Sequence, residues 1–265
     1  MFQIFSHRGS VEGNVETCEN SMRMLSRALA RGYSIEVDCR FGANREMVVF
    51  HDPDLLRLFA DSRQIVDVDA LELKRLYEEK TGCPEPAPAR LEALLEWPVF
   101  GSGGSSPEIL VDIKEPENLA LALAVCGAIT DANRESIAWL FDMDQRLIPE
   151  IHRAFPNIRM LARLSHLRGE DLDELQSLRK YIRGVWFDDY YGDLLGGRAE
   201  ATISDWDIPL FYVSPELHRD THVLGKSGYQ AAWKHVLGNT SFTAICTDFP
   251  EEFQRHLEIE RAGAS

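Results

Sequence analysis

The chain has 265 residues, 45% of them hydrophobic and 27% charged, which is enough for one large domain with a substantial core. Its formal net charge of −15 argues against a general affinity for nucleic acid or for an anionic membrane surface, because both repel an acidic protein. The first residues, MFQIFSHRGS, lack the basic and apolar regions of a signal peptide, and no window reaches about 18 consecutive apolar residues. The five cysteines include no CxxC pair. We therefore expect a cytoplasmic protein without a membrane anchor or a disulfide framework.

Short apolar or β-branched runs recur along the chain, and amphipathic segments at helical spacing lie between most of them. The runs occupy residues 2–6, 33–38, 108–113, 136–141, 158–163, 183–188, 208–213 and 243–248. Helices are expected around NSMRMLSRALARG, ENLALALAVCGAI, QRLIPEIHRAF and EDLDELQSLRKYI. Eight strand and helix units predict parallel strands closed into a (β/α)8 TIM barrel, as one domain over residues 1–265. A doubly wound open sheet is the main alternative.

The segment over about residues 39–107 interrupts this alternation. It contains a predicted hairpin, CRFGANREMVVFHD, that turns at GANR, and a predicted helix around DVDALELKRLYEEK. A proline-rich connector, GCPEPAPAR, a second helix, LEALLEW, and a loop, GSGGSSP, follow. We interpret the segment as an insertion after the second strand, with GSGGSSP as a flexible surface loop.

The second predicted strand, YSIEVD, carries two acids that share one face. Successive strand side chains alternate, so Ile35 and Val37 point one way while Glu36 and Asp38 point the other. Two neighbouring carboxylates are costly away from water unless a cation lies between them. Taken alone, the pair fits a metal site and a solvated face equally well.

In a parallel barrel, functional groups gather on the C-terminal face, where the strands end. Four segments bring polar side chains there: His7 and Arg8, Glu36 and Asp38, His51 and Asp52, and Asp112 and Lys114. Each has a structural interpretation as well, since a single histidine is more often structural than catalytic and Asp-x-Lys can be a simple ion pair. Their convergence on one rim favours function.

This set of groups is sufficient for phosphodiester cleavage. The three carboxylates suit a hard cation such as Mg²⁺ or Ca²⁺ better than the softer ligand sets that zinc favours. Together with such a cation, Arg8 and Lys114 would neutralise charge on the phosphoryl oxygens. His7 and His51 would supply a general base and a general acid, each worth about 10²- to 10⁴-fold in rate.

The chain resembles the glycerophosphodiester phosphodiesterases, within the wider group of phosphatidylinositol-phospholipase-C-like phosphodiesterases. The matching elements are SHRG at 6–9, EN at 19–20, IEVDCR at 35–40, VVFHDPDLLR at 48–57, ARLEALLE at 89–96, LVDIK at 110–114 and ICTDFPEEF at 245–253. The motifs of the first half occur in the order and at the approximate spacing of that family. In the second half, TDFP is the clearest match.

The resemblance implies a role for each matching residue. It implies an acid/base pair (His7 and His51), metal ligands (Glu36, Asp38 and Asp112), phosphate contacts (Arg8 and Lys114) and a supporting residue in the site's hydrogen bonds (Glu19). It further implies a divalent cation, Mg²⁺ or Ca²⁺, and a small glycerophosphodiester as substrate. The products would be glycerol 3-phosphate and an alcohol, formed through attack by the neighbouring glycerol hydroxyl on phosphorus.

Three positions depart from the pattern of the family. Asp112 stands where the family usually has Glu, although the related sphingomyelinase D group resembles this chain in having Asp-x-Lys. The W-T-V-N of the seventh barrel strand is FYVS at residues 211–214, and Leu140 replaces a small polar residue. Two alternatives therefore stay open: a sphingomyelinase D-like phosphodiesterase or lyase, and a catalytically silent barrel that binds a phosphorylated ligand.

Two further patterns have competing interpretations. His218 and His222, in HRDTH, have the i, i+4 spacing of metal ligands, but the segment has no nearby acidic third ligand and is predicted as a loop. The cluster WFDDYY at 186–191 offers ring faces and carboxylates to a choline-like cation, or is simply a packed strand end. Neither pattern enters the expected catalytic set.

Overall fold

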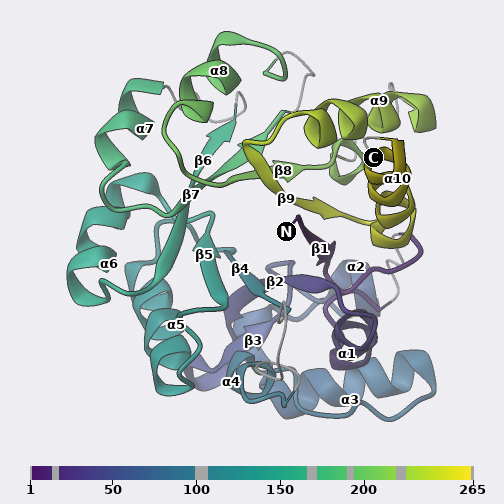
Figure 1. The fold of residues 1–265 in the computed structure, drawn as a ribbon. Helices are drawn as coiled ribbons and strands as arrows, with labels where there is room; N and C mark the ends of the chain where they lie inside the picture. The colour runs from purple at the N-terminus through teal and green to yellow at the C-terminus, as the bar shows by residue number, and fades with distance from the viewer. Residues whose placement is uncertain are drawn as a thin grey trace.

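Eight parallel strands close into a barrel in the computed structural model, which describes residues 2–13, 18–98, 107–165, 172–189, 194–218 and 225–263. The hydrogen-bonded order is β1-β9-β8-β7-β6-β5-β4-β2, and a further parallel pairing between β1 and β2 closes the ring. Helices surround the strands (Figure 1). The predicted (β/α)8 TIM barrel is confirmed, and the open-sheet alternative is wrong.

All eight strands predicted for the barrel are present. They are β1 (Gln3–His7), β2 (Ser34–Phe41), β4 (Ile109–Ile113), β5 (Ala138–Phe141), β6 (Arg159–Ser165), β7 (Gly184–Asp188), β8 (Leu210–Val213) and β9 (Phe242–Thr247). A short ninth strand, β3 (Met47–Val49), lies outside the barrel. The helices are α1 (Met22–Ala30), α2 (Leu56–Phe59), α3 (Ala70–Thr81), α4 (Leu91–Leu95), α5 (Leu119–Asp131), α6 (Ile148–Ala154), α7 (Leu172–Leu178), α8 (Arg198–Ser204), α9 (Gly225–Gly238) and α10 (Pro250–Gly263). The four predicted outer helices correspond to α1, α5, α6 and α7.

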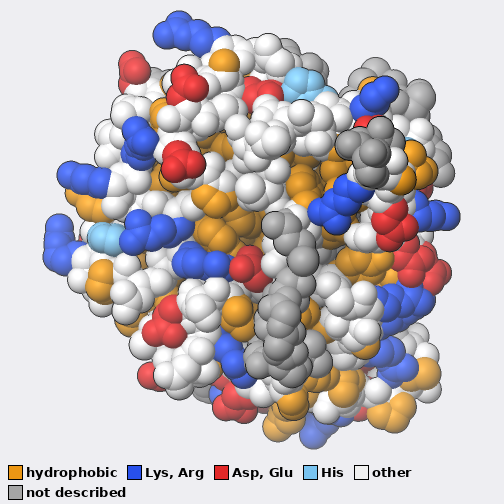
Figure 2. Space-filling view, in the orientation of Figure 1, with side chains coloured by type: hydrophobic (Ala, Val, Ile, Leu, Met, Phe, Trp, Pro, Cys, Tyr) orange, Lys and Arg blue, Asp and Glu red, His pale blue; other side chains and the backbone are white. Residues whose placement is uncertain are grey.

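Alternation along the strands sorts the buried side chains into two groups. One group, which includes Ile35 and Val37, packs with the helices around the barrel. The other comes from the opposite face of the strands and is rich in aromatic rings, such as Trp139 and Phe211, whose centroids lie 4.7 Å apart. Figure 2 shows hydrophobic side chains gathered near the middle of one face, with charged side chains around them. Apolar side chains thus fill much of the interior, and polar groups on the same strand faces lie toward the strand ends.

The segment between β2 and β4 forms its own small core beside the barrel. The end of β2 pairs with β3 as an antiparallel hairpin, which turns at residues 43–45 as predicted. Helix α3 begins after Asp69, whose side chain accepts a hydrogen bond from the Glu72 backbone nitrogen at 2.8 Å. Phe50 and Tyr77 pack in this core. Residues 99–106, which include most of the predicted glycine-serine loop, lie outside the described residues.

Two further expectations concern membranes and disulfides. None of the described helices combines the length and the apolar character that a membrane crossing requires. All five cysteines lie within the described ranges, and none of them forms a disulfide bond. Burial raises the pKa of the Cys126 thiol to about 12, so this side chain packs as a neutral group.

Candidate active site

The chain leaves β1 through a tight turn that the HRG motif makes possible. Both Arg8 (φ 52°) and Gly9 (φ 81°) adopt positive φ values. A Cβ atom on Gly9 would lie 2.9 Å from backbone atoms of Met24 and Leu25, so only glycine fits against α1. The turn brings the Arg8 backbone nitrogen to the Glu36 carbonyl oxygen (3.1 Å) and to Glu36 Oε2 (3.2 Å). The first strand end is thereby joined to the acidic face of β2.

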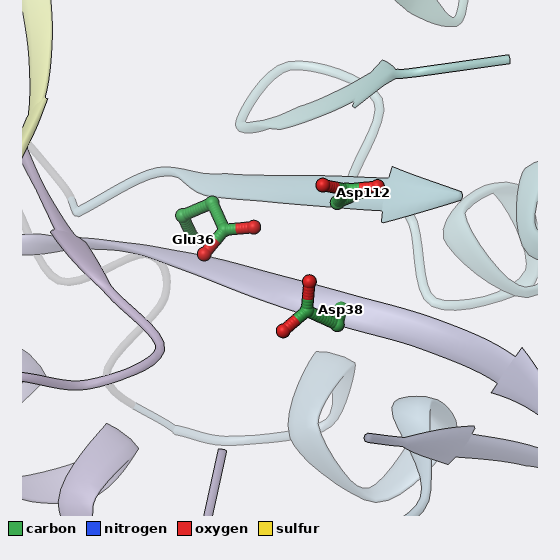
Figure 3. A group of neighbouring side chains, drawn as sticks. All are labelled: Glu36, Asp38 and Asp112. Carbon is green, nitrogen blue, oxygen red and sulfur yellow. The ribbon is translucent and has the colours of Figure 1, made fainter. Parts of the chain in front are cut away.

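Three carboxylates meet on the neighbouring strands β2 and β4. Glu36 and Asp38 project from the same face of β2, and Asp112 projects from β4, where it pairs in register with Asp38 (Figure 3). One oxygen of each lies within 4.8 Å of the others. The exposed fractions are 2% for Glu36, 0% for Asp38 and 6% for Asp112, so this acidic cluster is shielded from water. The short side chain of Asp112 is therefore long enough to join the other two carboxylates.

Two basic side chains contact the acidic cluster. Arg8 Nε lies 2.9 Å from Asp38 Oδ2, and Lys114 Nζ lies 3.0 Å from Asp38 Oδ1 and 2.6 Å from Asp112 Oδ2. Asn20 Nδ2 donates to Asp38 Oδ2 at 2.6 Å. Within the described part of the chain, Asp112 Oδ1 is buried and has no hydrogen-bond partner.

These contacts give the three acids different tendencies to ionise. Burial opposes ionisation of Asp38, but the charges of Arg8 and Lys114 outweigh it and hold the Asp38 pKa well below its usual value. Burial raises the pKa of Glu36 well above its usual value, and the neighbouring carboxylates add to this effect. Burial also raises the pKa of Asp112, to about 6, against the charge of Lys114. Without a further cation, the cluster thus favours partial protonation.

Each of the two histidines is held by a carboxylate. His7 Nδ1 lies 2.9 Å from Asp248 Oδ1, and His51 Nδ1 lies 2.6 Å from Asp52 Oδ1. Both contacts use Nδ1, so Nε2 of each ring is the atom available for proton exchange. Burial lowers the pKa of His51, against the opposing effect of Asp52. His7 pairs in register with Glu36, and Phe50, which precedes His51, donates its backbone N–H to the Asp38 carbonyl oxygen at 3.0 Å, so both histidines lie near the acidic cluster.

Glu19 connects the two sides of the rim. Its carboxylate accepts hydrogen bonds from Arg8 Nη1 and Arg57 Nη1, each at 3.0 Å. Arg57 Nε donates in turn to Asp52 Oδ2 at 2.6 Å, which is the aspartate that holds His51. The structure thus brings together all eight residues singled out from the sequence: His7, Arg8, Glu19, Glu36, Asp38, His51, Asp112 and Lys114.

Four residues of this network received no role from the sequence: Asn20, Asp52, Arg57 and Asp248. Each lies inside one of the motifs that resemble the family, namely EN, HDPDLLR or TDFP. The motifs contain these residues, but Asn20, Arg57 and Asp248 each have a partner that is distant in sequence, whereas Asp52 contacts its neighbour His51.

The other patterns noted in the sequence lie outside this network. His218 Nε2 pairs with Asp188 Oδ1 at 2.8 Å, and His222 lies outside the described residues. The Asp189 carboxylate accepts from the Leu194 and Leu195 backbone nitrogens, at 3.0 and 3.1 Å. Tyr190 and Tyr191 also lie outside the described residues.

The departures from the family pattern differ in where they lie. Leu140 is fully buried in the core between strands and helices. Phe211 packs inside the barrel against Trp139. Ser214 accepts a hydrogen bond from Trp233 Nε1 at 2.7 Å. Leu140 and Phe211 have apolar side chains, and the Ser214 hydroxyl is bonded to Trp233 and Glu216, away from the acidic cluster.

A closed barrel whose C-terminal rim gathers carboxylate, imidazole and basic groups defines the class of this protein, a (β/α)8-barrel enzyme. The sequence profile of the Glycerophosphoryl diester phosphodiesterase family matches residues 7–142. The chain belongs to this family, and its enzyme class is glycerophosphodiester phosphodiesterase, a phosphoric diester hydrolase. None of the curated proteins matches the chain.

Solved structures with the same fold include three glycerophosphodiester phosphodiesterases. The Parabacteroides distasonis enzyme has a TM-score of 0.70 at 16% identity, with 98% of this chain and 87% of that chain covered. The Agrobacterium tumefaciens enzyme has a TM-score of 0.66 at 16% identity, with 96% and 99% covered. The Thermotoga maritima enzyme has a TM-score of 0.64 at 16% identity, with 96% and 98% covered. At these identities, the similarity establishes the fold.

Proposed function

We propose that the chain is a metal-dependent phosphodiesterase that hydrolyses small glycerophosphodiesters to glycerol 3-phosphate and an alcohol. The observation that carries the proposal is the acidic cluster, with its oxygens within 4.8 Å of one another, at the same rim as two histidines that are each held by an aspartate. Family membership supports the diester substrate class. The absence of disulfides among its five cysteines supports action in the cytoplasm.

Glu36, Asp38 and Asp112 would hold the divalent cation. Asp112 Oδ1 is buried without a hydrogen-bond partner in the described residues, so the cluster has an acceptor to offer. Three carboxylate oxygens fit Mg²⁺ or Ca²⁺, which prefer hard oxygen ligands. When bound, the cation would offset the negative charge that develops on the phosphoryl oxygens.

Arg8 and Lys114 would contact the phosphate. The Lys114 ammonium group has three donors, and Asp38 and Asp112 use two of them, which leaves one for a phosphoryl oxygen. Arg8 is fixed by Asp38 and Glu19, so its guanidinium group has a defined position before substrate arrives. Preorganised charge of this kind stabilises the transition state without further rearrangement.

His7 and His51 would transfer the protons. The glycerol hydroxyl next to the phosphodiester would attack phosphorus and give its proton to one imidazole, while the other imidazole protonates the departing alkoxide. Since burial lowers its pKa, His51 is neutral at pH 7 and suits the role of base. Water then opens the cyclic phosphate to glycerol 3-phosphate. Glu19 would support both halves of the site through Arg8 and Arg57.

A product assay tests the proposal. We would incubate the enzyme with glycerophosphocholine, glycerophosphoethanolamine, glycerophosphoinositol and an aryl phosphodiester, with Mg²⁺ and Ca²⁺ supplied separately. We expect release of glycerol 3-phosphate, complete loss of activity in excess EDTA, and loss of activity in His7→Ala and in His51→Ala. Full activity in EDTA, or turnover retained in both histidine variants, would contradict the mechanism. A stable cyclic phosphate from a lysolipid would favour the sphingomyelinase D-like alternative.

A further inference from the structure

A cavity of about 1030 Å³ opens between the connections that follow β4 and β5, at the C-terminal end of the barrel strands. Its walls come from the connection after β4, the connection after β5 and the first turn of α7. Glu115, which lines it, directly follows Lys114, whose amine contacts two members of the acidic cluster. The Asp144 backbone nitrogen donates to the Pro116 carbonyl oxygen at 2.9 Å and ties two of the walls together. In sequence, the lining of the cavity therefore begins one residue after the proposed phosphate contact.

The lining of the cavity is acidic. The charged residues on the described walls are Glu115, Glu117, Asp144, Glu174 and Arg146. Arg146 is paired with Asp144, with Nε 2.9 Å from Oδ1, so its charge is already matched. Because the lining holds more carboxylates than cations, it favours a positively charged ligand.

An unpartnered amide lines the same cavity. Gln145 is 6% exposed, and neither its side-chain nitrogen nor its side-chain oxygen has a hydrogen-bond partner in the described chain. Buried amides are nearly always hydrogen-bonded, because an unsatisfied one has lost its contacts with water without replacement. Gln145 thus offers an acceptor oxygen and a nitrogen with two N–H donors to a ligand, independently of the carboxylates.

The chemistry of the lining distinguishes between kinds of cation. A quaternary ammonium group has no N–H to donate and is usually held by aromatic faces. Among the described residues that line the cavity, none is aromatic. A primary ammonium group instead donates three hydrogen bonds, which suits the Gln145 amide oxygen and the carboxylates.

We propose that this cavity binds a small molecule with a primary ammonium group. One source of that group is the alcohol part of the diester substrate, as in glycerophosphoethanolamine. This source rests on the proposed function. A free amine such as ethanolamine has the same chemistry and is the second source. Two arms of one experiment separate the two sources.

The first arm measures kcat/KM for glycerophosphoethanolamine and for glycerophosphoglycerol, which has no charged head group. Gln145→Leu should lower the value for glycerophosphoethanolamine by about tenfold, as expected for losing a hydrogen bond to a charged group. The double variant Glu117→Gln, Glu174→Gln should lower it by about fivefold. Glycerophosphoglycerol should change by less than about twofold in both variants, because it makes neither contact. Glu258→Gln, Glu260→Gln on α10 is the control with an equal change in net charge at exposed positions.

The second arm titrates ethanolamine into the wild-type protein and Gln145→Leu by calorimetry, without diester. Binding to the wild type alone identifies a free amine as a ligand, whereas a substrate preference without such binding identifies the head group. Gln145→Leu should be no less thermally stable than the wild type, since it removes an unpaired amide. An unchanged substrate ratio together with no ethanolamine binding overturns the inference. A wild type that cleaves neither diester would instead contradict the proposed function, and the calorimetry would still decide the cavity.

Discussion

Lys114 illustrates how single residues balance the charge of the rim. Its ammonium group lies within hydrogen-bond distance of both Asp38 and Asp112, from two neighbouring strands. Buried carboxylates without a counter-charge are costly, so Lys114 and Arg8 are the internal cations that allow the acidic cluster to exist. The same residues are the proposed phosphate contacts. Stability and function therefore depend on the same charges.

Replacing Lys114 tests this dependence. Lys114→Met should lower the free energy of unfolding in EDTA by about 2 kcal/mol. The loss is smaller than for a buried ion pair whose remaining partner stays charged, because Asp112, with its pKa near 6, can take up a proton. Mg²⁺ should restore most of the loss, since it replaces the missing positive charge. Urea unfolding with and without Mg²⁺ measures both effects. Lys234→Met, at an exposed position on α9, is the matched control, and an equal loss there would contradict the explanation.

Asp248 is expected to act through His7. Because it accepts from Nδ1 of the ring, Asp248→Asn should favour the wrong tautomer and lower kcat by about 10²-fold with little change in KM. Steady-state kinetics at saturating cation measure this difference. Asp205→Asn, at an exposed position after α8, should retain wild-type activity. A rise in KM alone would show that Asp248 affects substrate binding instead of proton transfer.

At the scale of elements, the site is formed by the barrel strands together with the inserted segment. The Tyr77 hydroxyl on α3 donates to the Glu19 carbonyl oxygen at 2.7 Å, and Arg57 on α2 contacts the Glu19 carboxylate. Strand alternation in the sequence predicted the barrel and the rim positions of Glu36 and Asp38, since parallel strands end on one face. It did not predict these supports, because a contact between a helix and a loop distant in sequence leaves no periodic pattern in the loop.

A half-buried acid also joins the ends of β8 and β9. Glu216 accepts hydrogen bonds from Ser214 and Thr247 and from the Asp248 backbone nitrogen. Burial raises its pKa from 4.5 to about 7, against the effect of the two hydroxyls. The folded state therefore binds this proton more tightly than the unfolded state does. The resulting stabilisation is complete below pH 4.5 and is lost as the pH rises through about 7.

Glu216→Gln should remove this pH dependence. Relative to the variant, the wild type should lose on the order of 2 to 3 kcal/mol in free energy of unfolding between pH 5 and pH 8. Urea unfolding of both proteins at several pH values measures the difference. Asp205→Asn serves again as control and should run parallel to the wild type. A constant difference between Glu216→Gln and the wild type across this range would show that Glu216 has an ordinary pKa.

At the scale of the whole molecule, the acidic cluster couples cation binding to the stability of the barrel. The strands that carry it, β2 and β4, pair with each other and join the barrel to the inserted segment, so repulsion within the cluster opposes a central pairing of the fold. A cation that binds only the folded state stabilises it, by about 2.7 kcal/mol at a concentration 100-fold above Kd. For a chain of this size, we expect the melting temperature to rise by on the order of 5 °C.

Thermal unfolding in EDTA and in saturating Mg²⁺ or Ca²⁺ measures this coupling. Because the chain carries a net charge of −15, sodium chloride at equal ionic strength must serve as a control for general screening. Asp112→Asn should be at least as stable as the wild type in EDTA, since one repelling charge is gone, yet should show a much smaller shift with the cation. An equal shift in Asp112→Asn would mean that the stabilising cation binds elsewhere among the 43 acidic residues, and the acidic cluster would lose its proposed role.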